Sequence, residues 1–136
     1  MKRELHRSIL WLAAIAILGV AAHSTYAQED NVPKQRLRSP AVVRGAIGGE
    51  AHASYVIRAR KGQLLTVRIS WRREGDNSAS FSVTKSASFF GGESIKFGKE
   101  SDDGKKFVGR VPSTGNYYIY VTAHPLAHYT LRVTVR

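Results

Sequence analysis

The sequence predicts an all-β fold, an antiparallel two-sheet β-sandwich of about eight strands. Three observations support it. Apolar and polar residues alternate with a period of two in several short segments, which is typical of strands with one face on a core. Turn-forming residues recur roughly every ten positions, the spacing found in sandwiches and barrels. After residue 27, no window keeps the i, i+3, i+4, i+7 apolar spacing of an amphipathic helix over three turns.

The first 27 residues have the composition of an export signal. Basic residues in MKRELHRS precede an apolar run from Ile9 to Ala22, and the small residues Thr25 and Ala27 are suited to a cleavage site after Ala27. The run is 14 residues long, whereas a membrane-spanning helix needs roughly 20. We therefore expect a cleaved signal peptide over 1–27, a periplasmic or secreted protein, and no membrane span after cleavage.

The mature chain has the size of one domain and is strongly basic. The full sequence has 136 residues and a formal net charge of +11; the signal holds three basic residues and one acidic residue, which leaves +9. This length excludes a multidomain enzyme. The sequence has no Cys, which excludes disulfides, thiolate metal sites and cysteine nucleophiles. With 43% hydrophobic residues, the chain is not of the disordered class.

The first half of the mature chain predicts a leader and then strands. Residues 28–40, QEDNVPKQRLRSP, hold two prolines and show no periodicity, so we expect a flexible leader before a sandwich domain over 41–136. A short strand over 43–47 comes first. Residues 54–59 and 65–70 then alternate on either side of the turn RKGQ. Two such runs around a short glycine-containing turn predict a β-hairpin.

The second half continues the pattern. Turn residues at 74–78 and 112–116 and a Ser- and Gly-rich loop over 85–104 separate the remaining strands. The further alternating segments are 81–83, 107–111, 117–122 and 129–135. The side chains expected to share one core are Leu65, Val67, Ile69, Ile119, Val121, Leu131, Val133 and Val135.

Basic residues gather on the predicted hairpin. Arg58 and Arg68 would pair across it and form a cationic outer strip, with Arg72 and Arg73 at the end of its second strand. Such a strip would attract an anionic polymer of the cell envelope, with an affinity that falls as salt rises. The alternative is a solvated sheet face that hinders edge-to-edge pairing.

No motif supports catalysis or metal binding. The mature chain has three histidines, which we interpret as surface or strand-edge residues, and it lacks the G-x-S-x-G, H-E-x-x-H and acidic calcium-loop patterns. Pro125 between His124 and His128 rules out a metal-binding pair one helical turn apart. We therefore expect no enzymatic activity, no cofactor and no metal.

The aromatic residues of the predicted outer face leave two alternatives open. Trp71 ends a strand, and Tyr118 and Tyr120 alternate with the predicted core positions. Exposed aromatic residues beside arginines are common in binding hot spots. The other possibility is that the two tyrosines pack beneath a loop such as 85–104, and the burial of Tyr120 separates the two alternatives.

Three segments carry a resemblance to known families. They are YVIRARKGQ followed by LLTVRIS, GRVPSTGNY followed by YIYV, and the closing YTLRVTVR. Through them, residues 44–136 resemble the small periplasmic inhibitors of goose-type lysozyme and are similar also to bacterial pre-peptidase C-terminal domains, which are β-sandwiches. The resemblance to the inhibitors implies that loops at one end of the sandwich plug the lysozyme's substrate cleft. On this chain those loops would be the turn 113–117 and the loop 122–128.

These observations predict an exported, non-enzymatic binding protein whose partner is a protein, with a lysozyme as the implied partner. The alternative is a cationic module, similar to pre-peptidase C-terminal domains, that binds an anionic envelope polymer or another protein. Nucleic acid is not expected as a partner in the periplasm. The expected binding residues are Ser113, Thr114, Gly115, Asn116, Tyr118, His124, His128, Arg58, Arg68, Arg72 and Arg73.

Overall fold

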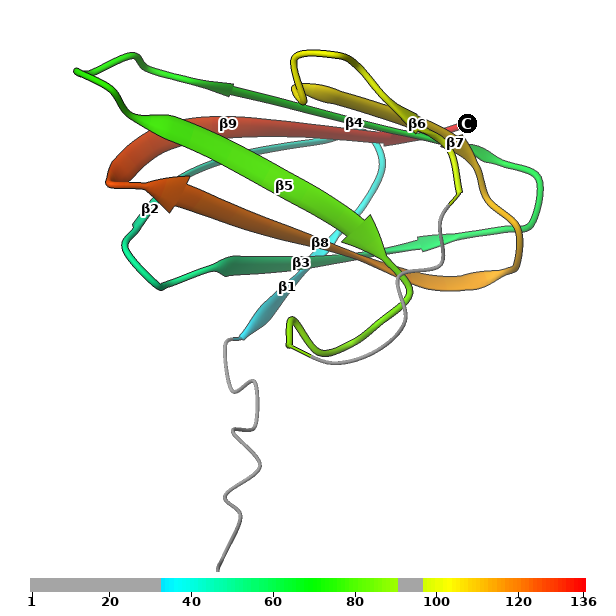
Figure 1. The fold of residues 1–136 in the computed structure, drawn as a ribbon. Coiled ribbons are helices and arrows are strands. Elements are labelled where there is room, and N and C mark those ends of the chain that lie inside the picture. The colour runs from blue at the N-terminus through cyan, green and yellow to red at the C-terminus, as the bar shows by residue number, and fades with distance from the viewer. Residues whose placement is uncertain (1–32, 91–96) are drawn as a thin grey trace, which may run out of the picture.

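The computed structural model describes residues 33–90 and 97–136, and these form two packed β-sheets (Figure 1). The first sheet has the strand order β1-β3-β8-β5, and the second sheet has the order β2-β9-β4-β7-β6. The strands are β1 (Lys34–Leu37), β2 (Ala41–Gly48), β3 (Ala53–Ala59), β4 (Leu64–Trp71), β5 (Ser78–Thr84), β6 (Lys99–Glu100), β7 (Lys106–Arg110), β8 (Gly115–His124) and β9 (Leu126–Val135). The predicted all-β sandwich is confirmed.

Two strands were not predicted. β1 lies inside the segment 28–40, so the expectation of a flexible leader is wrong for residues 34–37. Its pairing with β3 is parallel, whereas the other strand pairs are antiparallel. β1 has one apolar residue, Leu37, which is buried in the core, and backbone pairing with β3 also holds the strand in the sheet. The second addition is the two-residue β6. The predicted signal peptide lies outside the described residues.

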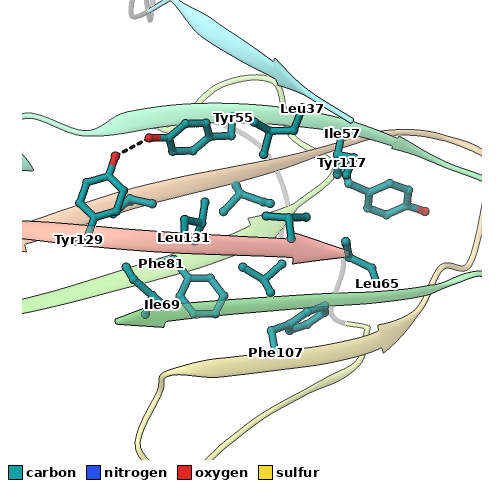
Figure 2. Packing of buried hydrophobic residues seen from close by; sticks show 14 of the residues in the cluster. Leu37, Tyr55, Ile57, Leu65, Ile69, Phe81, Phe107, Tyr117, Tyr129 and Leu131 are labelled. Carbon is teal, nitrogen blue, oxygen red and sulfur yellow. Dashed lines mark hydrogen bonds between the residues drawn. The ribbon is translucent and has the colours of Figure 1, made fainter. Parts of the chain in front are cut away.

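The core lies between the two sheets and follows the predicted alternation (Figure 2). Every predicted core residue except Val135 is buried, and Val135 packs against the core while half-buried. Tyr117, Phe81 and Phe107 join the same cluster. Since each buried aliphatic or aromatic side chain contributes about 1.5–3 kcal/mol, this interior holds the loops at both ends of the sandwich in place. None of the described residues belongs to a helix that could cross a bilayer.

A pair of tyrosines bridges the sheets inside the core. The hydroxyl groups of Tyr55 and Tyr129 form a hydrogen bond between β3 and β9 (Figure 2). Gly45, on β2, is the register partner of Tyr129 on β9. A Cβ atom at position 45 would lie 2.7 Å from the Tyr129 hydroxyl oxygen. Burial and the bond to Tyr55 raise the pKa of Tyr129 well above its ordinary value.

This raised pKa makes stability depend on alkaline pH. The unfolded chain loses the Tyr129 proton near pH 10.0, while the folded chain keeps it. The free energy of unfolding is therefore expected to hold up to that pH and to decline above it. Urea unfolding between pH 8 and about 11 measures the decline, and a Tyr129→Phe variant, which has no phenol to titrate, should decline less. Parallel curves for the two proteins would contradict this assignment.

Candidate functional site

Two turns meet at one end of the sandwich. They are the β3–β4 turn, residues 60–63, and the β7–β8 turn, residues 111–114, together termed the turn pair (Figure 1, right). The Gly62 N–H donates to the Val111 carbonyl at 2.8 Å, and the Val111 N–H donates to the Gln63 carbonyl at 2.8 Å. Gly62 has a φ of 88°, a conformation that favours glycine. These bonds make one unit of two segments that are distant in sequence.

Side chains reinforce the contact between the two turns. The Lys61 N–H donates to Oγ1 of Thr114 at 2.9 Å. Nη1 of Arg110 donates to the Gly62 carbonyl at 2.8 Å. Both bonds involve backbone atoms of the β3–β4 turn. The side chain of Lys61 is exposed.

The β7–β8 turn is also anchored to the core. Tyr117 is fully buried, and its hydroxyl group donates to the Ser113 carbonyl at 2.6 Å. The Ser113 N–H in turn donates to the same hydroxyl at 3.3 Å. Gly115 and Asn116 follow as the first residues of β8. The hydrogen bonds of Tyr117 therefore hold the segment that contains the predicted residues Ser113, Thr114, Gly115 and Asn116.

The turn pair and the strand ends beside it are cationic. Residues 58–63 and 110–116 contain no Asp or Glu. The exposed basic residues in these segments are Arg58, Arg60, Lys61 and Arg110. The sequence located the turn at 60–63 and placed Arg60 and Lys61 among the basic residues of the predicted hairpin. Only the folded chain brings that turn against the one at 111–114.

The predicted loop over 122–128 is not a loop. β8 continues to His124 and β9 begins at Leu126, so Pro125 alone connects the two strands. The flanking residues are kept in regular ladders with β5 and β2, which is why the connection is tight. It lies at the end opposite the turn pair (Figure 1, left). His124 is thus remote from Thr114, and His128 points outward from the second sheet.

The predicted hairpin of residues 54–59 and 65–70 does not form. β3 belongs to the first sheet and β4 to the second, so the turn between them crosses the sandwich. Arg58 pairs with Asn116, and Arg68 lies between Lys106 and Arg132. Arg58 and Arg68 therefore occupy opposite outer faces and cannot make one cationic strip.

Arg72 and Arg73 lie beyond β4, at the end opposite the turn pair. Nε of Arg72 is 3.2 Å from Oε1 of Glu74, and the two side chains are 78% and 48% exposed. An ion pair this exposed contributes little to stability, about 0–1 kcal/mol. Arg73 is exposed.

The two outer-face tyrosines differ. Tyr120 is only 2% exposed, and its hydroxyl group donates to the Ser86 carbonyl at 2.8 Å. Phe89 from the same segment packs edge-on against its ring at 5.4 Å. Packing beneath this part of the loop 85–104 is therefore confirmed for Tyr120. Tyr118 is half-buried.

The histidines do not converge. His52 is 7% exposed and its ring stacks on Phe89 at 4.2 Å, so the expectation of a surface position is wrong for this residue. His124 and His128 are exposed as expected. Within residues 33–90 and 97–136, no three His, Asp or Glu side chains come close enough to hold a metal ion.

Solved structures place this fold among two groups of proteins. The fold is similar to that of PliG from Aeromonas hydrophila, a periplasmic inhibitor of g-type lysozyme, with a TM-score of 0.61 and 23% identity over 76% of this chain and 96% of that chain. It is also similar to PliG from Salmonella Typhimurium, with a TM-score of 0.50 and 19% identity over 76% of this chain and 98% of that chain. The pre-peptidase C-terminal domain of the Bacillus anthracis collagenase is also similar (0.53, 15%, 76% and 95%). The predicted resemblance to both is confirmed in fold. No protein-family model and no curated protein sequence matches the chain.

Proposed function

We propose that this chain is an exported, non-enzymatic protein that inhibits a g-type lysozyme by inserting the turn pair into the enzyme's substrate cleft. The observation that carries the proposal is the cross-bonded turn pair, with its exposed Arg60 and Lys61, on a fold similar to that of the PliG inhibitors. Export rests on the composition of residues 1–27.

The charge of the turn pair suits such a cleft. Glycoside hydrolases cleave their substrates with carboxyl groups that flank the scissile bond. Arg60 and Lys61 offer cations to those groups without an acid of their own segment beside them. The mature charge of +9 slows the approach to a basic enzyme, so local pairing rather than long-range attraction would provide the specificity.

The rigidity of the turn pair favours tight binding. A loop that must be ordered on binding loses conformational entropy at that step. Here the bonds to Val111, Thr114 and Ser113 have already ordered both turns. Insertion would then require little rearrangement of the inhibitor.

Inhibition of cell-wall lysis tests the proposal. The mature protein, residues 28–136, is added to goose-type, chicken-type and invertebrate-type lysozymes, and the turbidity of a cell-wall suspension is followed. Lysis by the goose-type enzyme should fall by half at about 1 µM protein or less, an affinity ordinary for specific complexes. Undiminished lysis by all three enzymes at ten times that concentration would refute it.

A further inference from the structure

Three cations lie side by side across the second sheet. Arg132 on β9 pairs with Arg68 on β4, and Arg68 pairs with Lys106 on β7. Because neighbouring strands are about 4.8 Å apart, the three residues begin within about 10 Å of one another. Two residues along the strands from this row, Arg44 on β2 pairs with Thr130 on β9, which pairs with Ser70 on β4. We term this surface, around Arg44, Arg68, Lys106 and Arg132, the cation face.

The cation face is hollowed. One depression of about 450 Å³ includes Arg68, Arg132 and Lys106 in its lining, and a second of about 510 Å³ includes Arg44. Ser70 and Thr130 line both depressions, so the two adjoin. We term the two adjoining depressions the trough, in which hydroxyl groups lie beside basic side chains.

Acidic residues neutralise this trough only in part. The nine strands contain one acidic residue, Glu100, on the edge strand β6. In the described part of the chain, Arg44, Arg68 and Arg132 form no ion pair. One acid, Asp103, does line the trough. Its Oδ1 accepts hydrogen bonds from the Ser101 hydroxyl at 2.6 Å and the Lys105 N–H at 3.1 Å, and the first of these bonds lowers the pKa of Asp103.

Neither stability nor solubility explains the row of Arg132, Arg68 and Lys106. Like charges directly opposite each other on neighbouring strands are destabilising. Charges that prevent edge-to-edge pairing belong on edge strands, whereas β9, β4 and β7 are interior strands of the sheet. A surface charged only for solubility mixes both signs, whereas this one has one acid, Asp103, among several basic residues. An anionic ligand would remove the repulsion among the three cations.

The shape and chemistry of the trough favour a sugar polymer over nucleic acid. Single-stranded nucleic acid is bound by stacking on exposed aromatic rings. The aromatic residues at the trough are Tyr129, which is buried, and Trp71, which is half-buried with Nζ of Lys105 lying 4.9 Å from its ring centre. A sheet face also presents no projecting element that enters a duplex groove. Adjacent cations and hydroxyl groups match the sulfates, carboxylates and hydroxyls of an acidic polysaccharide.

We propose that the cation face is a binding site for an anionic polysaccharide, with Arg68, Arg132 and Lys106 holding its acidic groups and Ser70 and Thr130 its hydroxyl groups. The proposal goes beyond lysozyme inhibition, because it concerns another surface and is tested by a separate experiment. It also replaces the strip of Arg58 and Arg68 expected from the sequence, since Arg58 lies on the other outer face.

Heparin, a sulfated uronate polymer, is the probe. The mature protein should bind heparin and not neutral dextran, and the affinity should fall roughly 100-fold between about 50 and 200 mM salt. An Arg68→Glu/Arg132→Glu variant should lose about 100-fold in affinity at low salt. The matched control is Arg36→Glu/Arg58→Glu, which makes the same change of charge on exposed residues of the first sheet and should retain affinity within about threefold.

Three results would overturn the proposal. These are the absence of heparin binding by the unaltered protein, an equal loss in the two double variants, and binding of single-stranded DNA of matched length as tight as that of heparin. Circular dichroism and thermal unfolding establish that each variant is folded. Should the reversed variant fail to fold, Arg68→Gln and Arg132→Gln, tested singly, should each weaken heparin binding about fivefold, and unchanged binding in both would equally refute the site.

Discussion

Replacing Tyr117 with alanine is expected to lower the free energy of unfolding by about 4 kcal/mol. The side chain is fully buried near the start of β8 (Figure 2). Its ring packs edge-on against Phe97 at 5.3 Å, and Nζ of Lys85 lies 4.4 Å from the ring centre. The alanine would leave a cavity and would also remove the hydroxyl bond to Ser113. Urea denaturation at neutral pH measures the loss.

The adjacent residue provides the control. Tyr118 has the same side chain on the same strand, but it points to the outer face and is half-buried. Tyr118→Ala should therefore cost only about 1 kcal/mol. Tyr117→Phe, which keeps the ring, should cost about 1 kcal/mol through the lost hydrogen bond, and it should weaken lysozyme inhibition because the β7–β8 turn loses its anchor. Equal losses for Tyr117→Ala and Tyr118→Ala would contradict the sidedness of β8.

The alternation in β8 also shows what a sequence pattern can predict. When apolar residues recur at every second position, they mark the side of the strand that faces the core. This was enough to identify Leu65, Val67, Ile119 and Leu131 as core residues. The pattern does not state which strand is the partner. A turn such as 60–63 can close a hairpin or cross between sheets, and the alternation on either side is the same in both cases.

The candidate surfaces depend on which strands and turns become neighbours, and the alternation within one strand does not specify this. For this reason the sequence predicted these surfaces less well. The turn 113–116 was recognised by its composition, but its bonds to residues 60–63 come from distant parts of the chain. Arg132 and Lys106 become neighbours of Arg68 only through the registers of three strands. β1 was missed because a mostly polar strand has no apolar period to detect.

The turn pair and the cation face can be separated by charge reversal. Arg60→Glu/Lys61→Glu is expected to weaken inhibition of the g-type lysozyme about 100-fold. Both side chains are exposed, and the hydrogen bonds of these two residues within the turn pair come from backbone atoms, so the turn should keep its shape. The new carboxylates would face the acids of the cleft and repel them. Titrating lysis against inhibitor concentration gives the change in the inhibition constant.

The matched control for this variant is Arg68→Glu/Arg132→Glu, which alters net charge by the same amount on the cation face. It should inhibit lysozyme as well as the unaltered protein does, while Arg60→Glu/Lys61→Glu should retain most of its affinity for heparin. A general effect of lowering the positive charge would instead weaken both activities in both variants, or, if repulsion from a basic lysozyme dominates, strengthen inhibition in both. Opposite losses in the two variants therefore require two distinct surfaces, because net charge alone cannot distinguish proteins that carry the same total.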